Sequence, residues 1–381
     1  MRDLSGGERG QAVVVGVVVF LGFIVALAAL YQLQVVPLQT LQHEYAHEQA
    51  VDEDLTALNA QLVRAATEGE PTATTVAVGQ DYSSSLLFRT PPPLSGRLTA
   101  QSAGSVSVSN VDVTEEARKS PAGNAYGPYE TNTVTYTPQY VQYSNAPDTV
   151  LSGGQVLDRY PNGETTRVSG SSFVSGRQVT LVTVTGSPGE AEGLRQTVTA
   201  VPASAATDAV SVTNTPDERV TIRVPTVRSQ EAWDATLDAQ TVANGGHVVS
   251  KTVSDGVLTV VLEPGVTYDL RLARVDLGGG ESASEPAVDV GVVSGGARSV
   301  PPGGSQRVVV EAYDRFGNPV SGVRIAANTP SGWPGRVRST DRLGGSRTVA
   351  VTGENGRASF VVKSSETDVV NTGSVTYTVQ S

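Results

Sequence analysis

The amino-acid sequence predicts a mainly β protein that starts with one long N-terminal membrane and stalk helix and continues into β-sandwich domains. Three observations support this fold class. An uncharged apolar run extends from Ala12 to Leu30, and an apolar stripe with helical spacing follows it as far as Ala65. From Thr72 onward, short segments alternate Val with Thr or Ser between Gly, Pro and Asn residues, which is typical of strands in sandwiches or barrels.

The apolar run is the first predicted element, a helix over residues 11–36. Its length is close to the roughly 20 residues that one membrane-spanning helix needs, and Pro37 is the first strong helix breaker after it. Three interpretations are open. The run is an ordinary transmembrane anchor, a secretory signal peptide cut after Ala26-Leu27-Ala28, or a helix that is retained after a short leader is removed.

The third interpretation depends on the residues directly before the run. Arg9-Gly10-Gln11-Ala12 resembles the class III, prepilin-type leader of archaeal type IV pilins and archaellins. The resemblance implies that a prepilin-type peptidase removes residues 1–10 by cutting between Gly10 and Gln11. The apolar helix then stays in the membrane or packs into a filament core by self-assembly. Val15 stands where many bacterial pilins carry a glutamate, so the resemblance does not extend to subunit registration through a buried charge.

The charges that flank the run are weak orientation signals. The leader balances two arginines with two acidic residues, and the acidic residues between Glu44 and Asp54 contribute little to orientation. The long β-rich region downstream favours export. We therefore expect a single N-terminal span in the cell membrane, with an extracellular ectodomain at the cell surface.

A second helical pattern covers residues 37–70 and predicts an amphipathic stalk. Its apolar residues recur every three or four positions, Glu48 interrupts them, and Glu68-Gly69-Glu70-Pro71 ends the pattern. The stripe consists of Leu38, Leu41, Tyr45, Val51, Leu55, Leu58, Leu62 and Ala65. Two interpretations are open: a stalk that supports a head or forms filaments, or a helix that docks on its own domain.

The predicted stalk contains a literal H-E-x-x-H sequence, His43-Glu44-Tyr45-Ala46-His47. In zincins, the two histidines bind zinc from one helical face and the glutamate activates water. Here only His247 remains as a further histidine, and the charged Glu48 follows the second histidine. The apolar helix also stands where a zincin has its sheet. We interpret the sequence as a coincidental polar helix face and keep a membrane-tethered zinc hydrolase as a remote alternative.

Residues 71–277 are predicted to form a β-rich head region of one domain or two subdomains. Segments such as Val179 to Thr185 show the alternation of strands. Residues 229–240 are an exception. Ser229 is a good helix cap, and Trp233 and Leu237 are spaced as neighbours on one helical face, which predicts a short helix packed on a sheet.

Five tyrosines gather early in this head region. They are Tyr126, Tyr129, Tyr136, Tyr140 and Tyr143. Such a group forms a sugar- or protein-binding face, or it packs in the core and across strands. We favour packing. Taken with the leader, this region is similar to haloarchaeal pilin-like surface proteins.

Residues 278–304 are rich in Gly, Ser and Pro and are predicted to be a linker. Residues 305–381 then show strand–turn–strand patterns. The turn Asp314-Arg315-Phe316-Gly317-Asn318-Pro319 and the later segment from Gly353 to Phe360 resemble bacterial Ig-like modules of the invasin and intimin type. The resemblance implies an Ig-like β-sandwich, exposed at the surface as a spacer or an adhesive tip, here without the Cys pair of antibody domains.

The composition excludes several classes of function. The 381 residues include no Cys and three His, which removes disulfide scaffolds, thiolate metal sites and cysteine nucleophiles. With 38 acidic and 27 basic residues the net charge is -11, so nucleic acid is not an expected partner. The excess of acid and the presence of only three lysines indicate a surface suited to concentrated salt.

These observations predict a non-enzymatic, pilin-like cell-surface protein with a structural or adhesive role. We expect no catalytic residues, no cofactor and no metal. The expected partners are the membrane, the prepilin-type peptidase, further copies of the chain and a surface or cell ligand. The alternative is a single-span envelope protein or a minor pseudopilin of a secretion or uptake system.

Overall fold

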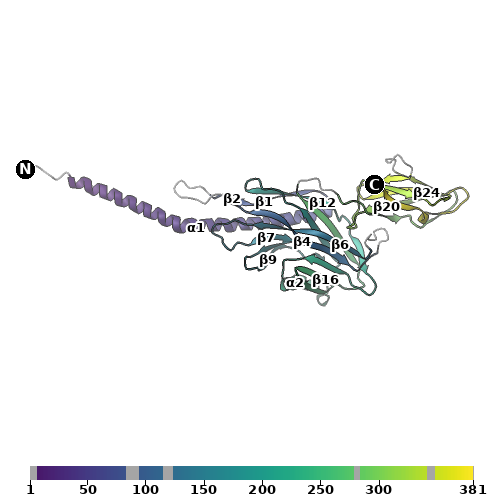
Figure 1. Cartoon of the computed structure of the whole chain (residues 1–381), viewed down its shortest axis with the longest axis horizontal. Helices are drawn as coiled ribbons and strands as arrows, with labels where there is room; N and C mark the ends of the chain where they lie inside the picture. The colour runs from purple at the N-terminus through teal and green to yellow at the C-terminus, as the bar shows by residue number, and fades with distance from the viewer. Residues whose placement is uncertain (1–6, 83–93, 115–122, 279–283, 341–347, 381) are drawn as a thin grey trace, which may run out of the picture.

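The computed structural model describes residues 7–82, 94–114, 123–278, 284–340 and 348–380, with the side chains of residues 7–12 and 94–95 outside this description. The predicted fold class is confirmed. The chain is mainly β, with one long N-terminal helix followed by β-rich parts (Figure 1). Most of the predicted leader, residues 1–6, lies outside the described residues.

Helix α1 (Gly7–Glu68) joins the two helices that the sequence predicts on either side of Pro37. A proline inside a helix removes one intrahelical hydrogen bond, and α1 continues through it. The Thr40 hydroxyl donates a hydrogen bond to the Val36 carbonyl (3.0 Å) directly beside the proline. At the other end, the Gly69 amide donates to the Ala65 carbonyl (3.1 Å) and Gly69 has a φ of 77°, the left-handed conformation with which glycine often ends helices.

The two halves of α1 have different surroundings. The first half projects away from the body of the protein (Figure 1), and its large apolar side chains from Val13 to Leu33 are exposed. Among the described residues, α1 is the one helix long and apolar enough to cross a membrane. In the second half, apolar side chains from Val51 to Ala66 are buried in the body.

The body that receives α1, which we call the head, contains two large sheets. The first consists of β1 (Thr72–Ala77), β12 (Arg195–Ser204), β17 (Tyr268–Leu277), β11 (Gln178–Gly186) and β10 (Val174–Ser175), with β13 (Val210–Asn214) and β5 (Val111–Val113) added beside β17. The second runs β15 (Val248–Ser254), β16 (Val257–Leu262), β14 (Thr221–Pro225), β4 (Arg97–Ser109), β6 (Ala125–Thr137), β7 (Asp148–Ser152), β8 (Gln155–Arg159) and β9 (Thr165–Gly170). A small separate pair joins β2 (Gly79–Gln80) to β3 (Leu94–Ser95). Neighbouring strands are antiparallel, except for the parallel pair β11 and β17.

The end of α1 fills the space between the two sheets. Leu55, Leu58 and Leu62 share one core with Val198 of the first sheet and Val134 of the second, and each is almost fully buried. From Val51 onward the apolar stripe therefore docks on its own domain, which is one of the two interpretations left open by the periodicity, whereas Leu38, Leu41 and Tyr45 of the same stripe are exposed. Because α1 supplies core side chains to both sheets, removing this half of the helix would leave a large cavity in the head.

Beyond the end of α1 the two sheets pack directly on each other. Leu181 of β11 and Ile222 of β14 belong to this second core. The predicted short helix is confirmed as α2 (Gln230–Leu237), followed by the short turns η2 (Asp238–Gln240) and η3 (Val242–Asn244). The Ser229 hydroxyl accepts a hydrogen bond from the Ala232 amide, and Trp233 and Leu237 are buried in the core as their spacing predicts.

The C-terminal module, strands β18 to β26, forms two facing sheets with a core of its own. One sheet runs β18 (Asp289–Ser294), β20 (Ser305–Tyr313), β24 (Arg357–Lys363) and β22 (Arg336–Ser339), and the other runs β23 (Val349–Val351), β21 (Arg324–Asn328) and β26 (Thr376–Gln380). β19 (Ser299–Val300) pairs with β25 (Val370–Asn371), just before the turn η5 (Thr372–Ser374). β18 and β19 come from the segment 278–304 that the composition predicts as a linker, so this segment also contributes to the module. β18 lies at the exposed edge of its sheet, so its residues do not alternate between buried and exposed as those of a half-buried strand do.

Candidate functional site

The exposed half of α1 is a candidate interaction surface. No charged residue occurs between Val13 and Leu41, a length of about 43 Å at 1.5 Å per residue. The hydrocarbon core of a bilayer is only about 30 Å thick. Leu33 and Leu38 are 75% and 61% exposed and lie towards the head end of this stretch. A bilayer centred on the apolar run would place Leu33 among the lipid headgroups and Leu38 in water, so other apolar side chains are the natural partners of Leu38.

The predicted cleavage site lies in the first turns of α1. The backbone is helical at Gly10 and Gln11, and the structure describes no side chains here. Cleavage between them stays a prediction from the leader resemblance.

Glu44 anchors α1 where the helix enters the head. Its side chain is fully buried. The two carboxylate oxygens accept hydrogen bonds from the backbone amides of Val141 (2.7 Å), Gln142 (2.9 Å) and Tyr143 (2.7 Å) and from the Tyr82 hydroxyl (2.7 Å). Hydrogen bonds to a buried carboxylate are among the stronger polar contacts in proteins. The segment 141–143, which follows β6, is thereby fixed to the helix.

These contacts explain the H-E-x-x-H sequence without a metal. The Glu44 carboxylate is engaged by four donors and does not point to solvent as a water-activating base must. His43 is exposed, and His47 is half-buried with its Nδ1 2.7 Å from the Tyr140 hydroxyl. The remaining histidine, His247, pairs with Glu263 instead (2.8 Å). In the described residues the three histidines therefore do not gather into one ligand set.

Of the five tyrosines that the sequence places close together, three are buried in the head and two are half-buried beside α1. Tyr126, Tyr129 and Tyr136 are buried, as packing predicts. Tyr140 and Tyr143 are half-buried and stack on each other, with ring centroids 6.1 Å apart, beside Tyr45 of α1. Tyr45, Tyr140 and Tyr143 thus form an aromatic cluster beside the point at which α1 leaves the head.

Three carboxylates meet one turn further along α1. Oxygens of Glu48, Asp52 and Asp158 all lie within 4.8 Å of one another. Glu48 and Asp52 lie one turn apart on the helix, and Asp158 comes from β8. The Thr149 hydroxyl, on the neighbouring β7, donates to Asp52 Oδ1 (3.1 Å). Burial, aided by the neighbouring charges, raises the pKa of Glu48 and of Asp158 to about 7, and burial also raises the pKa of Asp52.

This group, which we call the acidic triad, is the part of the site that could hold a metal ion. Local sequence patterns do not reveal this group, because Asp158 is far from the other two residues along the chain. Glu48 did give a signal, since it is a charged residue in the otherwise apolar stripe of α1.

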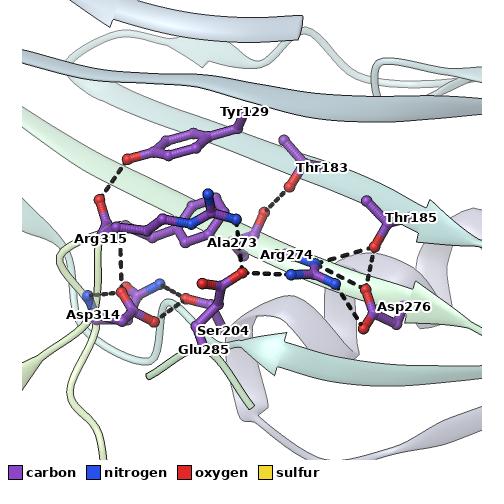
Figure 2. Close-up of polar contacts among 12 residues, drawn as sticks. Tyr129, Thr183, Thr185, Ser204, Ala273, Arg274, Asp276, Glu285, Asp314 and Arg315 are labelled. Atoms are coloured by element: carbon purple, nitrogen blue, oxygen red, sulfur yellow. Dashed lines mark hydrogen bonds and ion pairs between the residues drawn. The ribbon is translucent and has the colours of Figure 1, made fainter. Parts of the chain in front are cut away.

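A second polar site joins the C-terminal module to the head (Figure 2). The loop after β20 inserts Phe316 into the core of the head, where it is 1% exposed and stacks on Tyr129 with ring centroids 4.1 Å apart. Asp314 is 1% exposed and accepts a hydrogen bond from the Ser204 hydroxyl (2.6 Å) on β12. The Asn318 side chain donates to the Leu272 carbonyl (2.6 Å) on β17.

Charged groups surround this junction. Glu285 is 6% exposed and pairs with Arg274 of the head (2.5 Å) and with Arg315 of the inserted loop (2.8 Å). Figure 2 shows the Arg315 side chain between Tyr129 and Asp314, and its backbone carbonyl accepts from the Tyr129 hydroxyl (2.5 Å). Burial raises the pKa of Asp314 to about 6. The turn that the sequence assigns to the module is therefore also its attachment to the head.

No protein-family model matches the chain, and no curated protein matches it either.

Proposed function

We propose that the chain is a non-enzymatic, pilin-like surface protein that is anchored or polymerised through the exposed half of α1. One observation carries the proposal. The same continuous helix has an exposed apolar half and a second half that is the core of the head. A force on the apolar half is thereby transmitted directly to the packed core of the head, as an anchored or filament-forming subunit requires.

The arrangement of the two ends supports an outward-facing module. The start of α1 and the C-terminal module lie at opposite ends of the long axis (Figure 1). With α1 in a membrane or a filament core, the module is the outermost part, where a spacer or an adhesive tip acts. The Phe316 junction keeps the module attached through a core contact as well as through the chain.

The length of the uncharged stretch favours self-assembly over a simple anchor. Apolar side chains beyond the hydrocarbon core of the bilayer, Leu33 and Leu38, are covered when α1 packs among the helices of other copies. The alternative is a single-span envelope protein that never polymerises. That protein would leave Leu33 among the lipid headgroups and Leu38 exposed to water.

The mature N-terminus tests the leader. We expect N-terminal sequencing of the native protein to start at Gln11, and a Gly10→Val variant to retain Met1. A native protein that starts at Met1 would contradict the prepilin interpretation, and one that starts at Ala29 would indicate a secreted protein. Mass spectrometry of sheared and purified filaments then separates a filament subunit, which is abundant there, from a bare membrane anchor, which is absent.

A further inference from the structure

The acidic triad places three carboxylates together with no opposite charge. Glu48 and Asp158 are 6% and 8% exposed. Within the described chain, no lysine, arginine or histidine forms a salt bridge with any of the three acids. Like charges at this distance repel strongly where water is scarce. A protein that keeps them together needs a proton or a cation between them.

Asp158 supplies an observation that points to a ligand. Its Oδ1 atom is buried and has no hydrogen-bond partner among the described groups. A buried carboxylate oxygen without a partner is costly, because it has lost its water and gained nothing in return. The Asp158 carboxyl belongs to the triad and shares a hydrogen bond with Asp52, so Oδ1 is the oxygen of this carboxyl that still lacks a donor or a cation.

We propose that the acidic triad binds a hard divalent cation, Ca²⁺ in preference to Mg²⁺, and that the ion ties α1 to β8. Carboxylate oxygens are the ligands such ions prefer, and the group contains no nitrogen or sulfur ligand that would favour zinc. Ca²⁺ holds oxygens at about 2.3–2.6 Å, so two of its ligands lie at most about 5 Å apart. Three oxygens that lie within 4.8 Å of one another can therefore ligate one such ion together.

Mg²⁺ fits the same oxygens less well. It requires a nearly ideal octahedron, gives up its waters reluctantly and is usually bound through one or two carboxylates, whereas this largely buried group offers three. Two of the carboxylates are on a helix and one is on β8, which pairs with a strand on each side, so the backbone resists the rearrangement that an octahedron would require. The Thr149 hydroxyl, which donates to Asp52, orients that carboxylate for the ion.

The position of the site gives it a structural role. Glu48 and Asp52 lie between the Glu44 anchor and the first buried leucines of α1. An ion here would fix the helix to the second sheet at the place where the helix leaves the head. This inference does not depend on filament assembly, since a simple anchor would use the ion in the same way.

The experiment uses the full chain in detergent and compares three proteins. They are the wild type, Asp158→Asn, and the matched control Glu53→Gln, which removes the same charge from an exposed position on α1. Each is melted in EDTA, in about 10 mM Ca²⁺ and in about 10 mM Mg²⁺, well above the 10⁻⁴–10⁻³ M affinity typical of extracellular calcium modules. Direct binding is followed by Tb³⁺ luminescence, which Tyr143 and Tyr160 beside the triad would sensitise.

We expect Ca²⁺ to raise the Tm of the wild type and of Glu53→Gln by about 3 °C or more, and to leave Asp158→Asn unchanged. In EDTA, Asp158→Asn should melt above the wild type, because it removes one of the repelling charges without removing the side chain. Tb³⁺ luminescence should appear in the wild type and be displaced by Ca²⁺.

Three results would overturn the proposal. If neither Ca²⁺ nor Tb³⁺ affects the wild type, protons alone hold the triad together. If Asp158→Asn responds like the wild type, the cation binds elsewhere. An equal response to Mg²⁺ would overturn the assignment to calcium.

Discussion

Phe316 of the C-terminal module stacks on Tyr129 of the head, with ring centroids 4.1 Å apart and the ring of Phe316 almost fully buried. The ring belongs to the core of the head, although its chain segment belongs to the module. Arg315 covers both rings, with its guanidinium 5.5 Å from the centroid of Tyr129 and 5.2 Å from that of Phe316. The hydrophobic core of the head is therefore complete only when the module supplies Phe316.

Phe316→Ala should destabilise the head. Removing a buried phenylalanine ring leaves a cavity and costs about 3–5 kcal/mol. We expect faster amide hydrogen exchange in β4 and β6, which line this core. The matched control is Phe360→Ala, which removes a fully buried ring from the core of the module and should accelerate exchange in β20 and β24. If both variants affect only the module, the ring of Phe316 is not part of the head in solution.

Some of this architecture follows from local sequence signals. Ser229, Trp233 and Leu237 predict α2 because capping and side-chain spacing are short-range properties. The stripe of leucines predicts a helix for the same reason. The stripe does not predict which residues the leucines contact. In the structure, Leu55, Leu58 and Leu62 pack between the two sheets of the head.

The functional contacts depend on residues that are far apart in the chain, and local patterns do not report these. The histidines beside Glu44 in the sequence suggest a catalytic glutamate, but its hydrogen-bond partners in the structure include the backbone amide of Tyr143. Phe316 looks like part of a turn within the module, and its packing partner is Tyr129. Asp158 has an ordinary position in a strand until the sheet brings it to Glu48. In each case the contact forms only when segments that are far apart in the sequence come together in the fold.

Glu44→Ala should destabilise the protein without changing its zinc content. The variant leaves the amides of segment 141–143 and the Tyr82 hydroxyl without their acceptor, which costs about 2–4 kcal/mol in the free energy of unfolding. His43→Ala is the control, because His43 is exposed and surface substitutions usually change stability by less than about 0.5 kcal/mol. Urea unfolding measures the first expectation and elemental analysis the second. Stoichiometric zinc that is lost in His43→Ala would instead support the hydrolase alternative.

Leu33→Glu should prevent filament assembly while leaving the head folded. Leu33 is 75% exposed on the projecting half of α1, so the substitution removes no core contact. It places a charge where we propose that other copies pack, and an unpaired charge in such an interface is strongly unfavourable. Val249→Glu, an exposed apolar position on β15 of the head, is the matched control. The yield of sheared filaments should fall only for Leu33→Glu. Equal yields from both variants would favour the single-span alternative.

The acidic triad should make stability depend on pH when no cation is present. In the unfolded chain these acids ionise at about pH 4, whereas in the folded protein the pKa values of Glu48 and Asp158 are raised to about 7. Between these values the folded state binds more protons than the unfolded state. The free energy of unfolding in EDTA should therefore fall as the pH rises from about 4 to about 7, and level off above that range.

A bound cation would compete with these protons. The Tm increase caused by Ca²⁺ should thus be larger at pH 8 than at pH 5, because at pH 5 Glu48 and Asp158, whose pKa values are raised to about 7, are largely protonated. Asp158→Asn should reduce the fall in stability between about pH 4 and 7, and Glu53→Gln should retain it, since Glu53 is exposed. Urea unfolding at a series of pH values measures both. If the free energy of unfolding depends on pH in the same way in the wild type and in Asp158→Asn, Asp158 stays ionised in the folded protein. Repulsion by Glu48 and Asp52 then does not raise its pKa.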